Sequence, residues 1–268
     1  MAKSTKDHWS AEKYSSAADF VPKLTTTVLS YLDVQPGDHI LDIGCGDGQL
    51  TVQIATSASW GQVLGLDASR SFISTAQDKH SSKTCKFELH DCTHLANTPT
   101  PNAALHWILR NPETRVNVFR DAHRALKPGG KLVFEMGGKG NVAEVQAAFT
   151  AALMHAGLSI EAAREAKPWF FPSVEWMSRT LSEVGFEVEK CELEYRPTKC
   201  SAENVDGSGG LVGWLRLMGA QFLEAVGEGQ REAVLKEVCE ILETVVTREE
   251  DGSKWLGYTR LRAVARKQ

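Results

Sequence analysis

Four apolar runs have the length of buried strands, and they lie at 39–41, 63–67, 84–90 and 131–136. Between these runs, apolar residues recur at helical spacing. In the third run, Cys85, Phe87 and Leu89 alternate with polar residues and are expected to share one buried face. Strands that alternate with helices of these lengths are typical of a doubly wound, mostly parallel sheet. The pattern therefore predicts an α/β fold of the Rossmann-like kind.

Beyond residue 140 the pattern changes to helices, followed by strands whose apolar residues alternate. These strands predict a C-terminal antiparallel arm, and the helices predict a cap. Asn111, Ser69 and Ser173 are the expected N-caps of helices. We expect one domain with an N-terminal lid segment 1–33, a nucleotide-binding core 34–140, a helical cap 141–185 and 201–250, and C-terminal strands 186–200 and 254–268.

A glycine-rich turn follows the first predicted strand, with the sequence DIGCGDG at 42–48. Glycine permits positive φ and lets a ligand approach the backbone, and N–H groups at the start of the next helix face that ligand. A dinucleotide site spaces its glycines G-x-G-x-x-G, whereas the third glycine here, Gly48, comes one residue early. Asp67 ends the second strand about 20 residues further on, where a ribose-binding carboxylate is expected. The turn therefore indicates a nucleotide-like ligand other than a dinucleotide.

The composition mainly argues against binding to nucleic acid, membranes or metal ions. The 268 residues carry a formal net charge of −4, which gives no reason to expect binding to nucleic acid or to an anionic membrane. The six cysteines form no C-x-x-C pair, so we expect no metal site. No signal segment or membrane span is evident, which predicts a cytoplasmic protein. One cluster of cations is expected to be a solvated strand edge: Arg260, Arg262, Arg266 and Lys267.

The glycine turn, Asp67, Asp91 and the run LKPGGKLV at 126–133 resemble the class I methyltransferases that use S-adenosylmethionine (SAM). The runs NAALHW at 102–107 and GGLVGWL at 209–215 extend the resemblance to the trans-aconitate methyltransferase group, over most of the chain. Within this group the sequence looks closest to the fungal gliotoxin thiomethyltransferases, which S-methylate the thiols of reduced epipolythiodioxopiperazines. The resemblance implies a class I methyltransferase fold and SAM as the cofactor.

The resemblance also implies the cofactor contacts. Asp91 is expected to accept from the adenine amino group, and the N–H of Cys92 to serve a ring nitrogen. Tyr14 lies in the segment expected to fold over the cofactor. The full expected set is Tyr14, Asp42, Gly44, Cys45, Gly46, Gly48, Asp67, Ala68, Asp91, Cys92 and Asn102.

Large apolar residues dominate the expected acceptor site: Trp107, Met136, Trp169, Phe170, Phe171 and Trp214. This set suits a flat apolar small molecule better than a small tricarboxylate. Arg110, Arg164 and Arg216 could hold an acid, although an exposed helix face is the simpler interpretation. A thiol is partly ionised at neutral pH, so no essential base is expected, and His106 is the one general-base candidate.

The segment 93–102 departs from the family pattern, which has a fourth, central strand here. Pro99 and Pro101 each remove a hydrogen-bond donor, so the segment cannot form that strand. Either 103–109 fills the gap or the sheet lacks the strand. Two alternatives to thiol methylation stay open, namely O-methylation of a small carboxylic acid resembling trans-aconitate, and an inactive protein that binds SAM. The oligomeric state also stays open.

Overall fold

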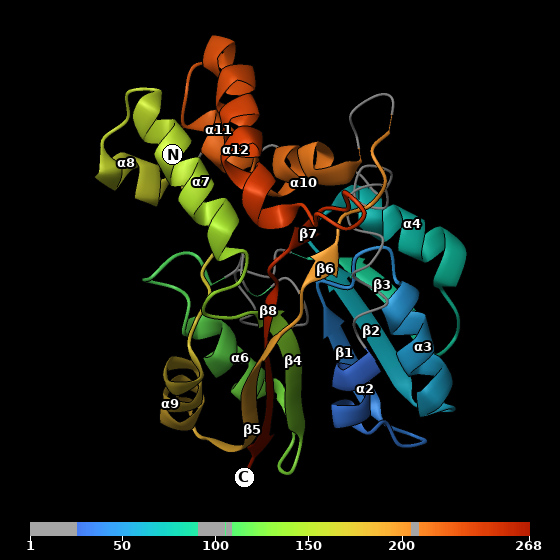
Figure 1. Cartoon of the computed structure of the whole chain (residues 1–268). Helices are drawn as coiled ribbons and strands as arrows, with labels where there is room; N and C mark the ends of the chain where they lie inside the picture. The colour runs from blue at the N-terminus through green and yellow to red at the C-terminus, as the bar shows by residue number, and fades with distance from the viewer. Residues whose placement is uncertain (1–25, 91–104, 106–108, 205–208) are drawn as a thin grey trace.

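A first, parallel sheet is built by β1 (His39–Ile43), α3 (Gln49–Ala58), β2 (Gln62–Asp67), α4 (Arg70–His80) and β3 (Cys85–Leu89). The computed structural model describes residues 26–90, 105, 109–204 and 209–268 (Figure 1). The strand order is β1-β2-β3, and the alternation of strand and helix confirms the predicted α/β pattern. The prediction for Leu89 is wrong: it is 43% exposed, because it ends β3 at the edge of this sheet.

A second, antiparallel sheet is built by β4 (Lys131–Gly137), β5 (Phe186–Tyr195) and β8 (Thr259–Lys267). Its order is β4-β8-β5, so the last strand in the sequence lies in the centre. Helices α6 (Asn117–Ala125) and α9 (Val174–Val184) contribute Phe119 and Met177 to the hydrophobic cluster on one face of this sheet. The C-terminal antiparallel arm is therefore confirmed.

Side-chain caps fix two of the predicted helix starts. The hydroxyl oxygens of Ser69 and Ser173 accept hydrogen bonds from backbone N–H groups at the starts of α4 and α9, as predicted. The predicted start at Asn111 is wrong, because α6 begins six residues later, at Asn117. Asn111 Oδ1 accepts from the N–H of Glu113 at 3.0 Å, which closes a turn in place of a helix.

No strand joins the two sheets in the described part of the chain, since β1 pairs with β2 and β4 pairs with β8. Within 103–109, the N–H of Leu109 donates to the carbonyl of Leu105 at 2.8 Å. This i to i+4 bond is the helical pattern. The two alternatives for 103–109 stay predictions, because only Leu105 and Leu109 of this segment are described. Residues 91–104 and 106–108 lie outside the described residues.

Packing, in place of hydrogen bonds, connects the two sheets. Leu105 and Leu109 are buried in one hydrophobic cluster with Ile43 of β1 and Phe134 of β4. Helix α2 (Thr26–Leu32), which precedes β1, also contacts the second sheet, because Tyr31 Oη donates to Glu192 Oε1 of β5 at 2.6 Å. The first sheet is therefore held against the second by apolar side chains and by α2.

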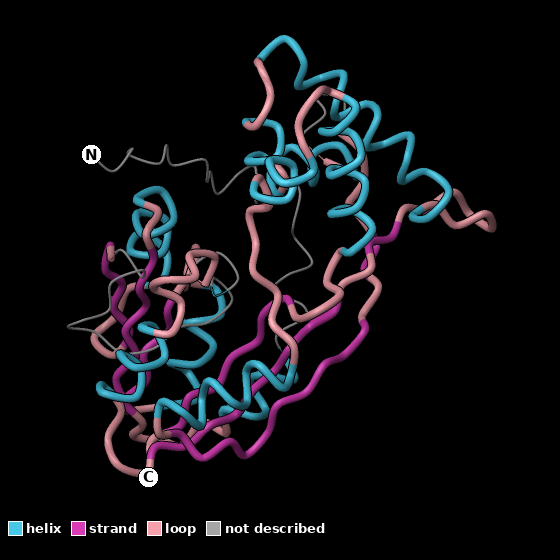
Figure 2. The backbone as a smooth tube through the Cα atoms, turned by 90° about the vertical axis from the view of Figure 1, so that its left-hand side faces the viewer, coloured by secondary structure: helices cyan, strands magenta, loops and turns pink. Residues whose placement is uncertain are grey.

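The cap is a separate group of helices that stands above the strands (Figure 2). It consists of α7 (Ala143–His155), α8 (Ile160–Glu165), α10 (Gly210–Met218), α11 (Ala220–Glu224), the 3₁₀ turn η2 (Glu228–Gln230) and α12 (Arg231–Val246). Its helices share a hydrophobic core of their own, centred on residues such as Phe149, Trp214 and Val238. Short strands β6 (Thr198–Lys199) and β7 (Trp255–Leu256) pair below it and connect it to β5 and β8.

Candidate functional site

Two glycines in the turn after β1 are required for different reasons. Gly46 has φ 56°, and a Cβ built there would meet no atom within 4 Å. Gly48 has φ 84°, but a Cβ there would lie 2.8 Å from the ring of Phe87. Both φ values favour glycine. Gly48 is therefore also a packing requirement, whereas Gly46 leaves space for a ligand against the backbone.

The carboxylate of Asp67 lies beside this turn, at the end of β2. Its Oδ2 accepts from the N–H of Gly46 at 3.0 Å, and its Oδ1 accepts from the N–H of Ser69 at 2.8 Å. Each carboxylate oxygen can accept more than one hydrogen bond, so donors such as two ribose hydroxyls are compatible with this geometry. Ala68, the next residue, is exposed. The open loop and the half-buried acid beside it fit a nucleoside.

Other expected cofactor residues are occupied by contacts within the protein. The N–H groups of Gly44 and Cys45 both donate to the carbonyl of Leu66, at 2.7 and 3.0 Å. Asp42 is buried, and its Oδ2 accepts from Thr51 Oγ1 at 2.6 Å. This bond ties the end of β1 to α3, so Asp42 supports the turn from below. The sequence signal for it is a polar residue, Thr51, within the buried face of α3.

Segment 167–172 contacts the end of β4. Its last residue, Pro172, accepts from the N–H of Lys139 at 2.7 Å. The ring of Phe171 lies so close to Gly137 that a Cβ at that position would clash with it. Strands β1 and β4 both run toward the cap in Figure 1, so this segment lies at the same end of the molecule as the glycine turn.

The aromatic residues of the expected acceptor site divide into two groups. Trp169 and Trp214 are both only 3% exposed, with ring centroids 6.2 Å apart in the core of the cap. Trp214 also donates from Nε1 to Tyr258 Oη at 2.8 Å. Phe170 and Phe171 are half-buried; the ring of Phe170 contacts Trp176 and the ring of Phe171 stacks on Trp169. Met136 of β4 is fully buried in the hydrophobic cluster that also contains Phe119 and Met177.

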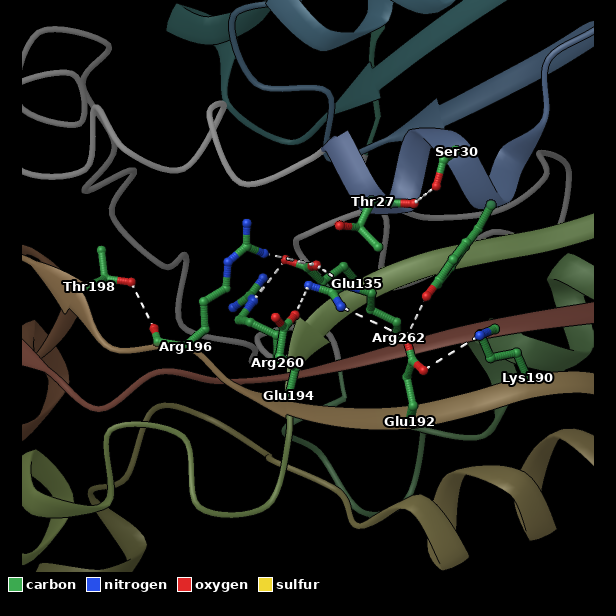
Figure 3. A network of polar contacts seen from close by, with 11 residues as sticks. Thr27, Ser30, Glu135, Lys190, Glu192, Glu194, Arg196, Thr198, Arg260 and Arg262 are labelled. Atoms are coloured by element: carbon green, nitrogen blue, oxygen red, sulfur yellow. Dashed lines mark hydrogen bonds and ion pairs between the residues drawn. The ribbon is translucent and has the colours of Figure 1, made fainter.

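A network of buried charges lies on the face of the second sheet that is turned toward α2 (Figure 3). Glu135 of β4 accepts from Arg260 Nε at 3.0 Å and from Arg262 Nε at 2.6 Å. Arg196 Nη1 lies 3.7 Å from the same carboxylate, and Arg262 also forms ion pairs with Glu192 and Glu194. The interpretation of Arg260 and Arg262 as a solvated strand edge is wrong, because they are 8% and 3% exposed.

The register explains this burial. Glu135, Arg262 and Glu192 lie directly opposite one another on the three strands, so an arginine of the central strand has an acid on each side. Burial lowers the pKa of Arg262, but hydrogen bonds to Glu135 and Glu194 more than offset this and the pKa is raised. The guanidinium therefore stays charged inside the protein. Sequence reasoning missed the network because its partners come from strands more than 50 residues apart.

Several predicted site residues lie outside the described residues: Tyr14, Asp91, Cys92, Asn102, His106 and Trp107. Of the three arginines considered as acid clamps, Arg110 donates to Gln221 and Arg216 pairs with Glu232 at 2.7 Å, and all three are exposed or half-buried on the surface. Within the described ranges, no group of His, Cys, Asp and Glu side chains could hold a metal ion. No helix in those ranges has the length and apolar character needed to cross a bilayer.

Comparison with known sequences gives a consistent set of relatives. The family model described as a methyltransferase domain matches residues 40–130. A fission yeast protein, uncharacterized methyltransferase C70.08c of Schizosaccharomyces pombe, is 34% identical over 269 residues, covering 98% of this chain and 99% of its own. A trans-aconitate 2-methyltransferase of Deinococcus radiodurans is 26% identical over 131 residues, covering 48% of this chain and 49% of its own.

Comparison with solved structures supports the same fold. A Bacillus halodurans structure described as a methyltransferase superposes with a TM-score of 0.58 at 15% sequence identity. The match covers 91% of this chain and 99% of that one. At this identity the likeness establishes the architecture alone.

Proposed function

The chain belongs to the methyltransferases that use S-adenosylmethionine, and we propose that it methylates a small apolar molecule held between the glycine turn and segment 167–172. The observation that carries this proposal is the hydrogen bond from Gly46 to Asp67, which keeps an open loop and a carboxylate together at adjacent strand ends. SAM, when bound, supplies a methyl group that its positive sulfur makes electrophilic. The protein's own task is then to align the acceptor and to exclude water.

We assign the cofactor contacts to the set expected from the sequence. Asp67 accepts from the ribose hydroxyls, and Gly46 lets the ligand approach the backbone because it has no Cβ. Gly44, Cys45, Gly48 and Asp42 shape the turn through their internal contacts. The remaining contacts, which rest on the resemblance, are Tyr14, Ala68, Asp91, Cys92 and Asn102.

For the acceptor we propose a thiol of an apolar secondary metabolite, such as a reduced epipolythiodioxopiperazine. Phe170 and Phe171 support this choice, since their half-buried rings suit a flat apolar molecule. A thiol with a pKa of about 8.5 ionises enough at neutral pH to react without a strong base. His106 is therefore proposed to be dispensable. The lid segment 1–33 and the expected cap complete the enclosure in this proposal, except that the end of the expected cap segment 141–185 forms α9, which packs on the second sheet.

A second candidate reaction is O-methylation of a carboxylic acid. One specific observation favours it: Arg115, a cation, lies over the ring of Phe170 with its Cζ 3.8 Å from the centroid. The relative from Deinococcus radiodurans is a trans-aconitate methyltransferase, which is the same chemistry. A carboxylate is already ionised and needs only a cationic partner.

Calorimetric titration with S-adenosylhomocysteine, followed by transfer assays, tests the proposal. We expect binding in the micromolar range, and methyl transfer to reduced gliotoxin but not to trans-aconitate. Transfer to trans-aconitate alone would replace the thiol with the acid as the acceptor class. A folded protein that binds no S-adenosylhomocysteine would contradict the proposal and favour the inactive alternative.

The variant Gly46→Val tests the cofactor loop. A valine side chain would fill the space beside Asp67 and strain a φ of 56°, so we expect at least tenfold weaker binding of S-adenosylhomocysteine. Gly129→Val is the matched control, because Gly129 has φ 76° and equally open surroundings but lies in the turn before β4. Equal binding by the two variants would exclude Gly46 from the cofactor site.

A further inference from the structure

Three cations surround the aromatic segment 167–172. Arg115, which precedes α6, lies on the ring of Phe170. Lys139, just after β4, bonds through its N–H to Pro172 at the other end of the segment. Lys167 begins the segment itself, and both Arg115 and Lys167 are half-buried. These three residues, here called the cation cluster, come from separate parts of the chain.

The cation cluster has no matching acid in the part of the chain that the structure describes. None of its three members forms an ion pair there with an aspartate or glutamate, and Arg115 Nε is buried without a hydrogen-bond partner. Burial lowers the pKa of Lys167, and the charges of Lys139 and Arg115 lower it further. Burial also lowers the pKa of Arg115. These like charges repel one another, and no aspartate or glutamate among the described residues forms an ion pair that would offset the repulsion.

The buried network around Glu135 shows how this chain treats cations that serve its own stability. Arg260 and Arg262 are both matched by carboxylates at 3.0 Å or less. The cation cluster has no such arrangement, although it lies at the end of β4 where the acceptor is proposed to bind. If the cation cluster had the same structural role as Arg260 and Arg262, acids would be expected beside it as well. The difference favours a negative group that is not among the described residues.

We propose that Arg115, Lys139 and Lys167 bind an anionic oxygen group, a carboxylate or a phosphate, carried by the methyl acceptor. The site deepens the proposed function and rests on it. The guanidinium of Arg115 is held by the ring of Phe170 and by a hydrogen bond from Nη2 to the carbonyl of Arg110 at 3.0 Å, which leaves Nη1 to donate to the anion, while the lysines act as point charges. The neighbouring rings of Phe170 and Phe171 contact the apolar part of the same molecule. The natural acceptor in this proposal is an apolar thiol that also carries an acidic group, and reduced gliotoxin serves in the transfer assay as a model dithiol without that group.

Titration of the protein saturated with S-adenosylhomocysteine tests this site, with citrate and inorganic phosphate as probes. We expect the double variant Lys139→Gln/Lys167→Gln to bind the preferred probe at least tenfold more weakly than the parent protein. Lys236→Gln, an exposed lysine on α12, is the control and is expected to bind like the parent. Citrate binding without phosphate binding identifies a carboxylate acceptor, and the reverse identifies a phosphate.

Failure of the site and failure of the proposed function give different results. If S-adenosylhomocysteine binds and methyl transfer proceeds, but the double variant and Lys236→Gln bind both probes equally, the cation cluster is not an anion site. If S-adenosylhomocysteine does not bind at all, the proposed function fails. Probe binding by the double variant and by Lys236→Gln, compared in its absence, then still shows whether the cation cluster binds anions. Arg115→Gln provides an independent check, since the lysines stay in place and the same weakening is expected.

Discussion

Glu135 is a single acid that neutralises two buried arginines. One of its oxygens accepts from Arg260 and the other from Arg262, and its side chain is only 6% exposed. A buried ion pair gains little over an apolar pair, but the loss of one partner leaves an uncompensated charge inside the protein. At this position Arg260 would lose its carboxylate partner, and Arg262 would keep only Glu192 and Glu194. The identity of residue 135 should therefore matter far more than that of a surface acid.

The variant Glu135→Gln should lower the free energy of unfolding by about 3–5 kcal/mol, because buried Arg260 loses its carboxylate partner and Arg262 loses the acid on one side. Glu240→Gln is the control, since Glu240 pairs with Lys236 across an exposed helix face at 3.6 Å. Its expected cost is below about 1 kcal/mol. Urea unfolding followed by circular dichroism gives both values. Equal costs for the two variants would mean that other groups or water satisfy the arginines.

Among the elements, α2 connects the start of the first sheet to the edge of the second. The hydroxyl of Tyr31 donates to Glu192 Oε1, and Lys190 Nζ lies 4.8 Å from the centre of the Tyr31 ring. The hydrogen bond from Tyr31 lowers the pKa of Glu192 below its ordinary value, and nearby positive charges lower it further. The contact therefore favours the ionised carboxylate.

The direction of this pKa shift predicts how the stabilisation by the Tyr31–Glu192 hydrogen bond depends on pH. Because the pKa of Glu192 is lower in the folded state, its ionisation stabilises the protein above the unfolded pKa of 4.5. This stabilisation is lost as the pH falls through the lowered pKa of the folded state. Tyr31→Phe should therefore be less stable than the parent near neutral pH, by less than about 1 kcal/mol because Glu192 is partly exposed. The difference should shrink as the pH falls below 4.5 and through the lowered pKa of Glu192. Tyr195→Phe, at a tyrosine 69% exposed, should show no such trend in urea unfolding.

Elements with local signals could be predicted from the sequence, and elements defined by distant partners could not. The run 42–48 predicts the turn, because glycine spacing and a following amphipathic helix are local properties. Ser69 and Ser173 cap helices through their own neighbours. The burial of Arg260 and Arg262 depends on the pairing of β8 with β4, more than 120 residues away. A strand with alternating arginines looks solvated until its partners are known.

At the scale of the whole molecule, the two sheets are held together by side chains. Leu105 and Leu109 are fully buried in the cluster that contains Ile43 from one sheet and Phe134 from the other. Backbone hydrogen bonds tolerate changes in side-chain volume, but packing between close-packed surfaces does not. Residues in this cluster should therefore have an unusually large effect on overall stability.

The variant Leu109→Ala should destabilise the protein by about 3 kcal/mol, because it leaves a cavity where the two sheets meet. Leu193→Ala is the matched control, since Leu193 lies on β5 and is 39% exposed. Its expected effect is below about 1 kcal/mol. Thermal and urea unfolding of both variants provides the comparison. A cost at Leu109 no larger than at Leu193 would show that other contacts hold the sheets together.

The position of β8 between β4 and β5 also has a consequence for synthesis on the ribosome. β4 ends at Gly137 and β5 at Tyr195, but neither touches the other, and their common neighbour is completed only at Lys267. The first sheet can form as soon as its residues emerge, since its strands follow one another closely in sequence. In the nascent chain the apolar strand β4 and the more polar strand β5 therefore lack the strand that pairs with both, while some 70 further residues are translated. Newly made chains should accordingly depend on chaperones during that interval.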